Sequence, residues 1–286
     1  MSTPKVSIIY VNYNTQDLLE DSLRSLVASK PKYSYEVIVE ENGSKEFTAD
    51  RIKKIFPEVV IVKSQANLGF GGGNNLGAKR AQGEYLWLLN TDTLIPEDNN
   101  FDKVLVWLEQ HPEYAAAAPL LVNEHGKEQA AQVSRFPSIW RMVLEKPVGL
   151  LIRLLPVARK MFGWLDPRFV PIRSADVDQA VAAALLVRRS VFEKVGGFSK
   201  EYFFFYEDTD LCKKFASEGL KIRFVRDAKI IHLLGKSITS QYERKQRYYR
   251  AQDIYFRKWK SLPARVFVKT FRFPLVLWHR LKALGS

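Results

Sequence analysis

The sequence is poor in cysteine and lacks any long apolar run. Its single cysteine, Cys212, cannot form an intramolecular disulfide, which fits a reducing compartment. No segment reaches the roughly 18 consecutive apolar residues of a membrane span, because the nearest candidate, 148–164, contains two arginines, a lysine and a proline. No secretory signal is visible, since the apolar start of the chain gives way to polar residues at 12–15. We therefore expect a cytoplasmic protein without a membrane-spanning helix.

Acidic residues are scarce at the end of the chain. The sequence carries a formal charge of +13, and residues 242–286 hold twelve lysines and arginines against two acids, a net charge of +10. Aromatic residues are interleaved with these charges, among them Tyr248, Tyr249, Tyr255, Phe256, Trp259, Phe267, Phe271, Phe273 and Trp278. This composition is typical of a segment that binds an anionic membrane surface or nucleic acid, although a solvated helical hairpin packed on the main domain would also show it. We favour the membrane surface and expect no nucleic-acid partner.

The first half of the chain alternates between apolar runs and helical patterns. Runs typical of buried strands occupy 5–11, 35–40, 59–64 and 85–89, and helical patterns cover 18–26, 47–55 and the residues after the glycine-rich loop 67–75. Asn14 or Thr15 would cap the first helix. Strand–helix alternation of this kind predicts an α/β fold with a mostly parallel central sheet and helices on both faces.

The second half is less regular. The run 179–189 is typical of a buried strand, and 190–198 is typical of a short helix that Gly196 or Gly197 ends. Residues 139–164 mix apolar and basic side chains, which suits either a packed subdomain or a segment at a membrane interface.

Carboxylates lie just beyond two of the predicted strands. Asp92 closely follows the run 85–89, and Glu41 follows 35–40 directly. Ligands of parallel α/β sheets bind at the carboxyl ends of the strands, where Tyr13 also falls. A plain turn would explain Asp92 as well, but its position favours a chemical role.

A second acidic feature is the pair Glu207 and Asp208. A helix predicted from about Thr209 places both acids at its N-terminus. The helix dipole there favours the ionised carboxylate, which is the state that a general base requires at neutral pH. Acids also cap helices without any catalytic role, so a structural interpretation stays open.

The glycine-rich stretch 67–75 suggests a different function class. A dinucleotide fingerprint follows a strand, opens a helix and has an acid about twenty residues further on, as Asp92 is here. Its third glycine should fall at position 74, which is Asn74. The alternative is therefore a dinucleotide-binding or non-catalytic protein whose basic tail docks on nucleic acid or membrane.

Seven segments, taken in chain order, resemble one known family. They are "VSIIYVNYNTQDLLEDSLRSL", "VIVEENGS", "NLGFGGGNN", "GEYLWLLNTDT", "AAALLVRRSVFEKVGGF", "YFFFYEDTDLCKKFASEG" and "IIHLLGKS". Each is weak alone, but the ordered set, over about residues 5–237, resembles the family 2 glycosyltransferases of the GT-A fold. Within that family the chain looks closest to the bacterial rhamnosyltransferase-like branch that builds surface polysaccharides.

The resemblance implies a reaction and an organisation of the chain. The reaction is an inverting sugar transfer from a nucleotide-sugar, with rhamnose from a dTDP donor as the suggested sugar, to a hydroxyl of a lipid-linked saccharide. A divalent metal, Mg²⁺ or Mn²⁺, would assist it. Residues 1–120 would form the nucleotide-sugar-binding half of a Rossmann-like GT-A domain, 121–241 the acceptor half with the catalytic base, and 242–286 a basic helical tail on the inner face of the cell membrane.

The resemblance also assigns roles to individual residues. Asp92, in a DXD-like element where Asn90 replaces the first acid, would bind the metal together with His232, although His232 alone would be read as a core histidine. Asp208 would be the base that takes the acceptor proton, with Glu207 as the second choice. The residues implied in donor binding are Val11, Tyr13, Glu41, Asn67, Asn75, Thr91, Asp92 and Ser237. Glu41 departs from the family's aspartate, and Asn67 and Asn75 would serve equally well to fix their own loop.

Overall fold

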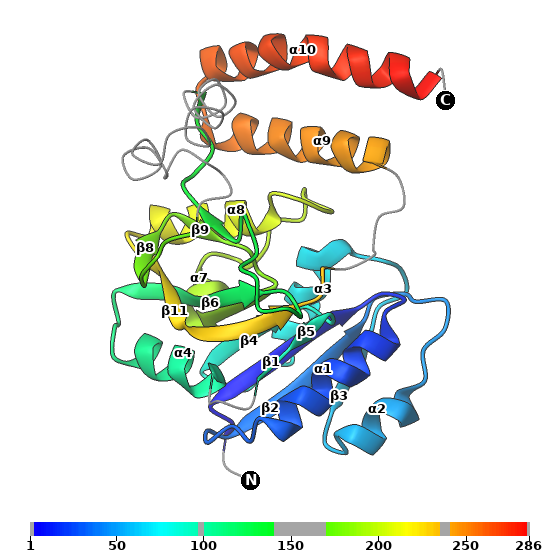
Figure 1. The fold of residues 1–286 in the computed structure, drawn as a ribbon, viewed down its shortest axis with the longest axis vertical. Helices are drawn as coiled ribbons and strands as arrows, with labels where there is room; N and C mark the ends of the chain where they lie inside the picture. Colours follow the sequence, from blue (N-terminus) through cyan, green and yellow to red (C-terminus); the bar gives the residue numbers. More distant parts are fainter. Residues whose placement is uncertain (1–2, 97–99, 140–169, 235–240, 285–286) are drawn as a thin grey trace.

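The computed structural model describes residues 3–96, 100–139, 170–234 and 241–284. The helices within these ranges are α1 Gln16–Ala28, α2 Ala49–Ile55, α3 Gly69–Ala78, α4 Asn100–Glu109, α7 Arg189–Lys194, α8 Glu207–Ser217, α9 Gln241–Trp259 and α10 Leu262–Leu284. The strands are β1 Val6–Asn12, β2 Tyr35–Glu41, β3 Val60–Lys63, β4 Tyr85–Leu89, β5 Thr93–Leu94, β6 Tyr114–Val122, β7 Val133–Ser134, β8 Ala175–Val177, β9 Gln179–Ala180, β10 Ala184–Arg188 and β11 Lys221–His232 (Figure 1). Ser237 and nearly all of 139–164 lie outside the described residues.

A mixed, mostly parallel sheet forms the centre of the molecule, which confirms the predicted fold class. Its strand order is β3-β2-β1-β4-β10-β6-β11-β5, with β8 paired to β11. The pairs among β1 to β4 and the pair β6–β11 are parallel, whereas β10 runs antiparallel to both of its neighbours. Because β6 spans residues 120 and 121 and β10 lies between β4 and β6, the two predicted halves of the domain share one sheet.

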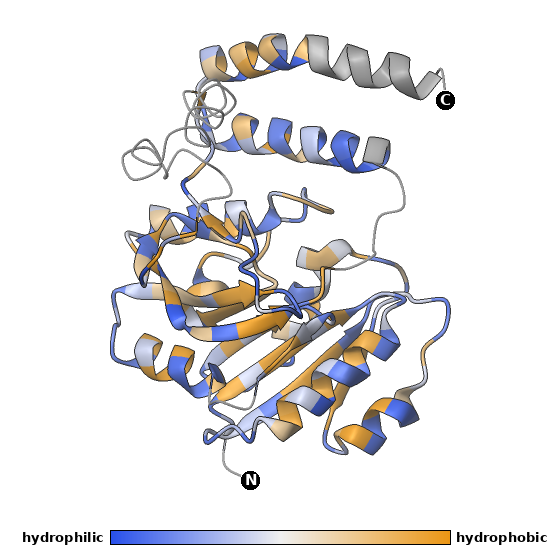
Figure 2. Ribbon diagram, viewed as in Figure 1, coloured by the Kyte–Doolittle hydropathy of each residue, from blue (hydrophilic) through white to orange (hydrophobic). Residues whose placement is uncertain are grey.

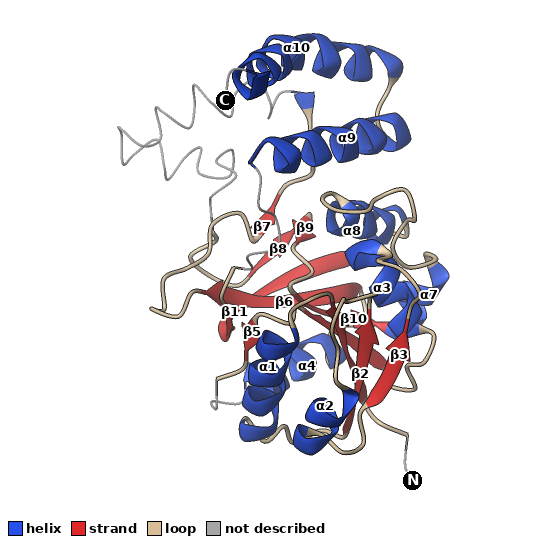
Figure 3. Cartoon of the chain, turned by 90° about the vertical axis from the view of Figure 1, so that its right-hand side faces the viewer, coloured by secondary structure: helices blue, strands red, loops and turns tan. Residues whose placement is uncertain are grey.

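Alternating side chains of the strands divide the core into two layers. Ile8 and Tyr10 pack with apolar residues of α1, α2 and α4, whereas Ile9 packs on the opposite face with residues of α7 and α8. Figure 2 shows the hydrophobic strands, and Figure 3 shows helices on both sides of the sheet. The period of two along β1 therefore buries both faces, as the apolar run 5–11 predicts.

The glycine-rich stretch is a helix, not the predicted loop. Gly69–Ala78 forms α3, and a Cβ at Gly73 would lie 2.6 Å from a methyl group of Val11, while one at Gly77 would lie 2.7 Å from a methyl group of Ile9. The glycines allow α3 to approach β1 closely, and this packing accounts for them without a bound phosphate.

The predicted strand 179–189 is two strands. Gln179–Ala180 forms β9 and pairs with β7 in a small separate sheet, and Ala184–Arg188 forms β10 in the main sheet. The short connection between them reaches the edge of the sheet where β4 ends, since Ala184 lies opposite Leu89. Because residues 180–187 are all apolar, the sequence gives no sign that the chain leaves the small sheet and enters the main one.

The tail forms two helices, α9 and α10, that stack beyond α8 (Figure 1). Tyr202 and Tyr206 of the main domain enclose a separate apolar core with Ala251, Tyr255 and Phe256 of α9 and Val268 of α10. The tail is therefore packed on the main domain along one side. None of the described helices is both long enough and apolar enough to cross a membrane.

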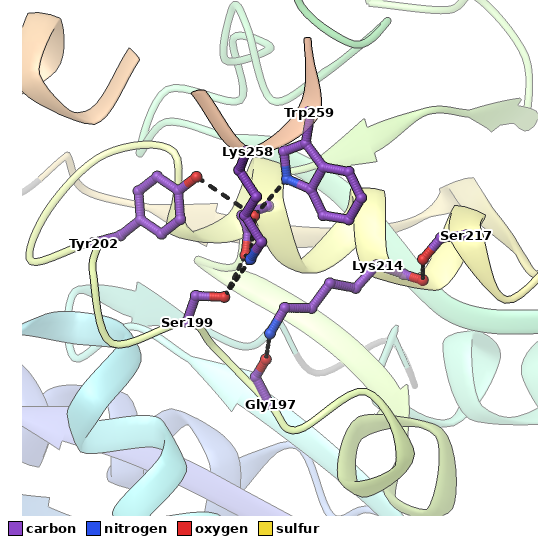
Figure 4. A network of polar contacts seen from close by, with 8 residues as sticks. Gly197, Ser199, Tyr202, Lys214, Ser217, Lys258 and Trp259 are labelled. Carbon is purple, nitrogen blue, oxygen red and sulfur yellow. Dashed lines mark hydrogen bonds and ion pairs between the residues drawn. The ribbon is translucent and has the colours of Figure 1, made fainter. Parts of the chain in front are cut away.

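A buried acid attaches the end of α9 to α8. The Asp210 side chain is fully buried and accepts from Ser199 Oγ at 2.6 Å, Lys258 Nζ at 2.9 Å and Trp259 Nε1 at 2.6 Å. Figure 4 shows Lys258 and Trp259 converging with Ser199 and Tyr202 on this point. Because Asp210 lies two residues after Asp208, the tail is fastened next to the predicted base.

Asp210→Ala should loosen the tail. Removing one partner of a buried, hydrogen-bonded ion pair costs roughly 3–5 kcal/mol of unfolding free energy, because the remaining donors lose their acceptor. We expect faster amide hydrogen exchange in α9 with unchanged exchange in β1, measured by mass spectrometry. Asp227→Ala, which changes an exposed acid on β11, is the matched control. Wild-type exchange in α9 of the Asp210 variant would contradict the proposed attachment.

Candidate active site

The carboxyl ends of β1, β2 and β4 are joined by buried polar side chains. Asn12 is fully buried, and its Nδ2 donates to Glu41 Oε2 at 3.3 Å. Thr15 Oγ1 donates to Asn12 Oδ1 at 3.1 Å and lies 2.9 Å from Thr91 Oγ1. Thr15 precedes α1 as expected, but its hydroxyl binds these strand ends instead of capping the helix. This edge is where the sequence predicts the nucleotide site.

Several predicted donor-binding residues have structural partners in the described chain. Glu41 Oε1 accepts from the Ser44 backbone N–H at 2.5 Å, so its carboxylate closes the turn after β2. Asn67 Oδ1 accepts from the Gly69 backbone N–H at 2.8 Å, and Asn75 exchanges two hydrogen bonds with the Phe198 backbone at 2.8 and 2.9 Å. These contacts fit the scaffold interpretation of Asn67 and Asn75.

Other predicted donor residues remain accessible or lie beside the edge. Tyr13 is 44% exposed at the end of β1, whereas Val11 packs against Gly73 of α3. Thr91 is nearly buried and contacts Thr15. Tyr13 is therefore the predicted residue best placed to meet a nucleobase.

Pairing of β5 with β11 brings Asp92 and His232 together. His232 lies opposite Thr93 in the antiparallel register, and the Leu233 backbone N–H donates to the Asp92 carbonyl at 2.9 Å. The Asp92 Oδ1 and His232 Nε2 atoms are 3.2 Å apart, and both side chains are more than 90% buried. These two residues, separated by 140 positions in the chain, thus form one constellation, as the resemblance implies.

Both ring nitrogens of His232 have polar partners. Nδ1 lies 2.8 Å from Gln129 Oε1, which can only accept, so Nδ1 carries the proton. Nε2 lies 3.3 Å from Asn90 Nδ2, a donor, and 3.2 Å from Asp92 Oδ1, an acceptor. In the neutral ring with its proton on Nδ1, Nε2 offers its lone pair to a ligand. A histidine whose second ring nitrogen is held by an amide oxygen is oriented as metal-ligating histidines usually are.

Asp92 and His232 fit two adjacent ligands of one divalent cation. Their facing atoms are both electron-pair donors, and adjacent ligands of an octahedral cation with bonds of about 2.1 Å lie about 3.0 Å apart, close to the separation seen here. No group of three or more histidine, cysteine, aspartate or glutamate side chains suited to a metal occurs among the described residues. Oxygens of a bound diphosphate and water would therefore have to complete the coordination.

The acid pair begins α8, two residues earlier than the sequence predicts. Tyr206 precedes it in the left-handed region, with φ of +63°, and its hydroxyl accepts from Gln252 Nε2 of α9 at 3.1 Å. Asp208 Oδ1 accepts from the Thr209 backbone N–H at 2.7 Å, which fixes its carboxylate. Glu207 Oε2 is buried and has no hydrogen-bond partner among the described residues. Asp208, which is only half-buried, is the more accessible acid of the two.

Burial controls the protonation of this pair. Burial, and then the charge of Asp208, raise the pKa of Glu207. Burial also raises the pKa of Asp208, although hydrogen bonds from Thr209 partly oppose it. Raised pKa values at a cavity suit acids that exchange protons near neutral pH.

One cavity of about 1030 Å³ joins the two constellations. His232 and Asn90 line it together with Glu207 and Asp208. It does not include Tyr13 or Glu41 among its lining residues, so the predicted nucleobase end lies outside it. The cavity is large enough for a saccharide between the candidate cation-binding pair and the candidate base.

Some residues of this site give no signal in the sequence. Gln129 lies in a polar stretch typical of turns, and only the fold brings it to His232. Gln252 belongs to the basic tail, yet it contacts the residue before the acid pair. Long-range contacts of this kind follow from packing and have no local pattern.

If Asp208 is the general base, as the resemblance implies, the reaction rate should increase with pH and then level off, because only the deprotonated carboxylate accepts a proton. Burial and then the charge of Asp208 raise the pKa of Glu207, so Asp208 loses its proton first, while Glu207 is still neutral. Glu207→Gln therefore removes no charge during this step, and the rising limb of kcat should stay close to its wild-type pH. Glu201→Gln, which changes a nearby exposed acid, is the control. A limb that moves clearly to lower pH in the Glu207 variant would show that Glu207 is charged first and would refute this order of proton loss.

Comparison with known proteins identifies the family of the chain. Residues 7–162 match the family "Glycosyl transferase family 2", and residues 174–235 match "N-terminal domain of galactosyltransferase". The O-antigen biosynthesis protein RfbC of Myxococcus xanthus is 28% identical over 238 residues, which cover 80% of this chain but only 17% of that protein. The N-acetylglucosaminyl-diphospho-decaprenol L-rhamnosyltransferase of Mycobacterium tuberculosis is 25% identical over 252 residues, which cover 80% of this chain and 76% of the relative.

A solved structure supports the fold. The mannosyltransferase PcManGT of Pyrobaculum calidifontis, in complex with GDP-Man and Mn²⁺, superposes with a TM-score of 0.60 at 17% identity, covering 100% of this chain and 75% of that one. A match at this identity concerns the arrangement of the elements alone. Because the family match spans more than half of the sequence, and the central sheet agrees with it, the chain belongs to glycosyl transferase family 2 and has the GT-A fold.

Proposed function

We propose that the protein is an inverting, metal-dependent glycosyltransferase of cell-surface polysaccharide synthesis. It would move a sugar, with rhamnose from dTDP-rhamnose as the first donor to test, to a hydroxyl of a lipid-linked saccharide. The observation that carries the proposal is the single cavity lined by His232, which contacts Asp92, and by Asp208. The relative that acts on N-acetylglucosaminyl-diphospho-decaprenol supports a lipid-linked acceptor.

Asp208 is assigned as the general base. Its carboxylate accepts the proton of the acceptor hydroxyl while that oxygen attacks C1 of the donor sugar from the face opposite the nucleoside diphosphate. The new C1–O bond forms as the bond to the diphosphate breaks, so the configuration at C1 inverts. The Thr209 N–H holds Asp208 in place for this transfer.

Asp92 and His232 are assigned to the leaving-group end of the site. Together they would hold Mg²⁺ or Mn²⁺, and Gln129 would keep the His232 ring in its ligating tautomer. A cation bound there would stabilise the negative charge that develops on the leaving diphosphate. Tyr13, at the end of β1, would contact the base of the donor.

A donor panel tests this proposal. Purified protein is incubated with Mn²⁺ or Mg²⁺ and a set of nucleotide-sugars, and nucleoside diphosphate release and thermal shift are recorded. We expect one donor to give both a shift and metal-dependent release, which EDTA removes. Release that is indifferent to EDTA, or the absence of any shift over the whole panel, would contradict the proposal.

The outer surface of α10 supports a location at the inner face of the membrane. Leu262, Val266 and Phe273 are 63%, 56% and 65% exposed, and Lys269 is also exposed. Each basic residue near an anionic surface contributes about 1 kcal/mol, and exposed apolar side chains add insertion at headgroup depth. The tail would therefore bind by its outer side while its inner side packs on the main domain.

Substitution of this outer surface should weaken membrane binding. We expect Val266→Ser with Phe273→Ser to lower co-sedimentation with anionic vesicles roughly 10-fold, because the insertion of two apolar side chains is lost. Ile172→Ser, which changes an 80% exposed apolar residue of the main domain, is the control. Point variants are preferable to a deletion of 242–286, which would uncover Tyr202 and Tyr206. Negligible pelleting of the wild type would exclude the membrane role, and salt-sensitive retention of duplex DNA would favour nucleic acid.

A further inference from the structure

An aromatic wall connects the acid pair to the tail. We use this name for Phe204, Phe205, Tyr206, Tyr248 and Tyr249, all of which line the cavity that contains Asp208. The ring centroids of Phe204 and Phe205 are 4.6 Å apart, those of Phe205 and Tyr248 are 5.7 Å apart, and those of Tyr248 and Tyr249 are 6.0 Å apart. The wall is therefore continuous from the loop before α8 to the side of α9.

Arg244 of α9 adds a positive charge to this wall. Its guanidinium carbon lies 5.9 Å from the Phe205 ring centroid, and the side chain lines the same cavity. Two other cavity arginines are engaged by acids, Arg272 by Asp253 at 2.7 Å and Arg135 by Asp178 at 3.1 Å. Arg244 is exposed and has no carboxylate partner within the described ranges, so its charge is available to a ligand.

An apolar path continues from the cavity onto α10. Phe271 lines the cavity, is 45% exposed and stacks on Phe267 with centroids 5.9 Å apart. In Figure 1, α9 lies between α8 and α10. The surface along this path is acidic at α8, aromatic and positively charged at the wall and Arg244, and apolar at α10. A ligand with a hydroxyl, an anionic group and a lipid chain in that order would match this sequence of surfaces.

We propose that α9 forms the acceptor subsite of the enzyme. The aromatic wall stacks against the saccharide that carries the attacking hydroxyl, and Arg244 binds the phosphate that joins this saccharide to its lipid. A planar guanidinium pairs with phosphate through two parallel hydrogen bonds, and aromatic rings offer flat apolar faces to a sugar ring. This inference rests on the proposed function and assigns its acceptor contacts to the tail.

Binding of two probes tests the inference. The first probe is N-acetylglucosamine linked through diphosphate to a farnesyl chain, and the second is the neutral farnesyl glycoside of the same sugar. Calorimetry should show that the wild type binds the diphosphate probe more tightly, and that Arg244→Gln loses about 10- to 100-fold affinity for this probe alone. Tyr248→Ala should weaken both probes to a similar extent, because it removes part of the stacking surface.

Arg250→Gln is the matched control, because Arg250 is also an exposed arginine of α9 but does not line the cavity. Arg250→Gln should bind both probes as the wild type does. Arg244→Gln should still pellet with anionic vesicles as the wild type does, which would show that Arg244 binds the acceptor phosphate and not the phosphates of lipid headgroups. Equal affinity of the wild type for the two probes, or equal losses in both arginine variants, would overturn the inference. If the enzyme turns over a donor but binds the two probes equally well, this subsite alone is refuted. If it binds the diphosphate probe more tightly but turns over none of the donors, the proposed function is refuted and the subsite stands.

Discussion

Asp208→Asn should reduce sugar transfer by about 10²- to 10⁴-fold while donor binding is retained. Asparagine keeps the shape and the hydrogen bond from the Thr209 N–H but cannot accept the acceptor proton. Single-turnover rates with the donor found in the panel measure the loss, and calorimetry of the nucleoside diphosphate measures the retained binding.

Stability provides the control for this variant. Because burial raises the pKa of Asp208, the folded state favours its neutral form, and the ionised carboxylate lowers stability as the pH rises through that pKa. Asparagine removes this charge, so the melting temperature should stay the same or increase. If Asp208→Asn turned over within a few-fold of the wild type, Glu207 would be the base instead. If Asp208 is the base, Glu207→Gln should lose less activity than Asp208→Asn.

Asp92→Ala should abolish metal-dependent binding of the nucleoside diphosphate, with a loss of at least about 100-fold in affinity. Asp92 Oδ1 faces His232 Nε2 at 3.2 Å and brings the negative charge of the pair. Removal of residues that merely orient a metal ligand already costs about 10- to 100-fold in affinity. His232→Ala should weaken metal affinity less, because a neutral nitrogen is lost instead of a charge.

Calorimetry with and without EDTA separates the metal effect from nucleoside binding. The free nucleoside should still bind the Asp92 variant through the Tyr13 end of the site. His125→Ala, which changes a highly exposed histidine, is the control for the His232 variant. If metal dependence were unchanged in Asp92→Ala, residues 90–92 would be a plain turn.

Local pattern predicted the parallel part of the sheet but not its antiparallel insertion. The runs at 5–11, 35–40 and 85–89 became β1, β2 and β4, because short apolar runs between helical patterns are typical of parallel strands. The strand β10 looked like its neighbours in composition, and nothing in its residues indicates that it runs the opposite way between β4 and β6. The sequence predicts a loop where α3 lies, because close packing of a helix on a strand and a phosphate-binding loop both require small residues such as glycine.

The sequence predicts only those residues of the candidate site that belong to recognisable motifs. Asp92 and His232 were paired through family resemblance, and the β5–β11 register supplies the physical reason for their contact. The link from Tyr206 to Gln252 of α9 joins distant segments through packing, so no spacing in the chain reveals it. The tail was predicted from its charge as a surface-binding segment, whereas its packed inner side follows from the apolar core that it completes.

The central claim is that Asp92 and His232 hold a divalent cation against the donor diphosphate in the cavity that contains Asp208. Anomalous diffraction at the manganese edge, from crystals soaked with Mn²⁺ and dTDP, tests it directly. We predict one strong peak within about 2.0–2.3 Å of both an Asp92 carboxylate oxygen and His232 Nε2, with diphosphate oxygens completing the coordination. Bound nucleotide with no manganese at this pair, or manganese held by other side chains, would contradict the account.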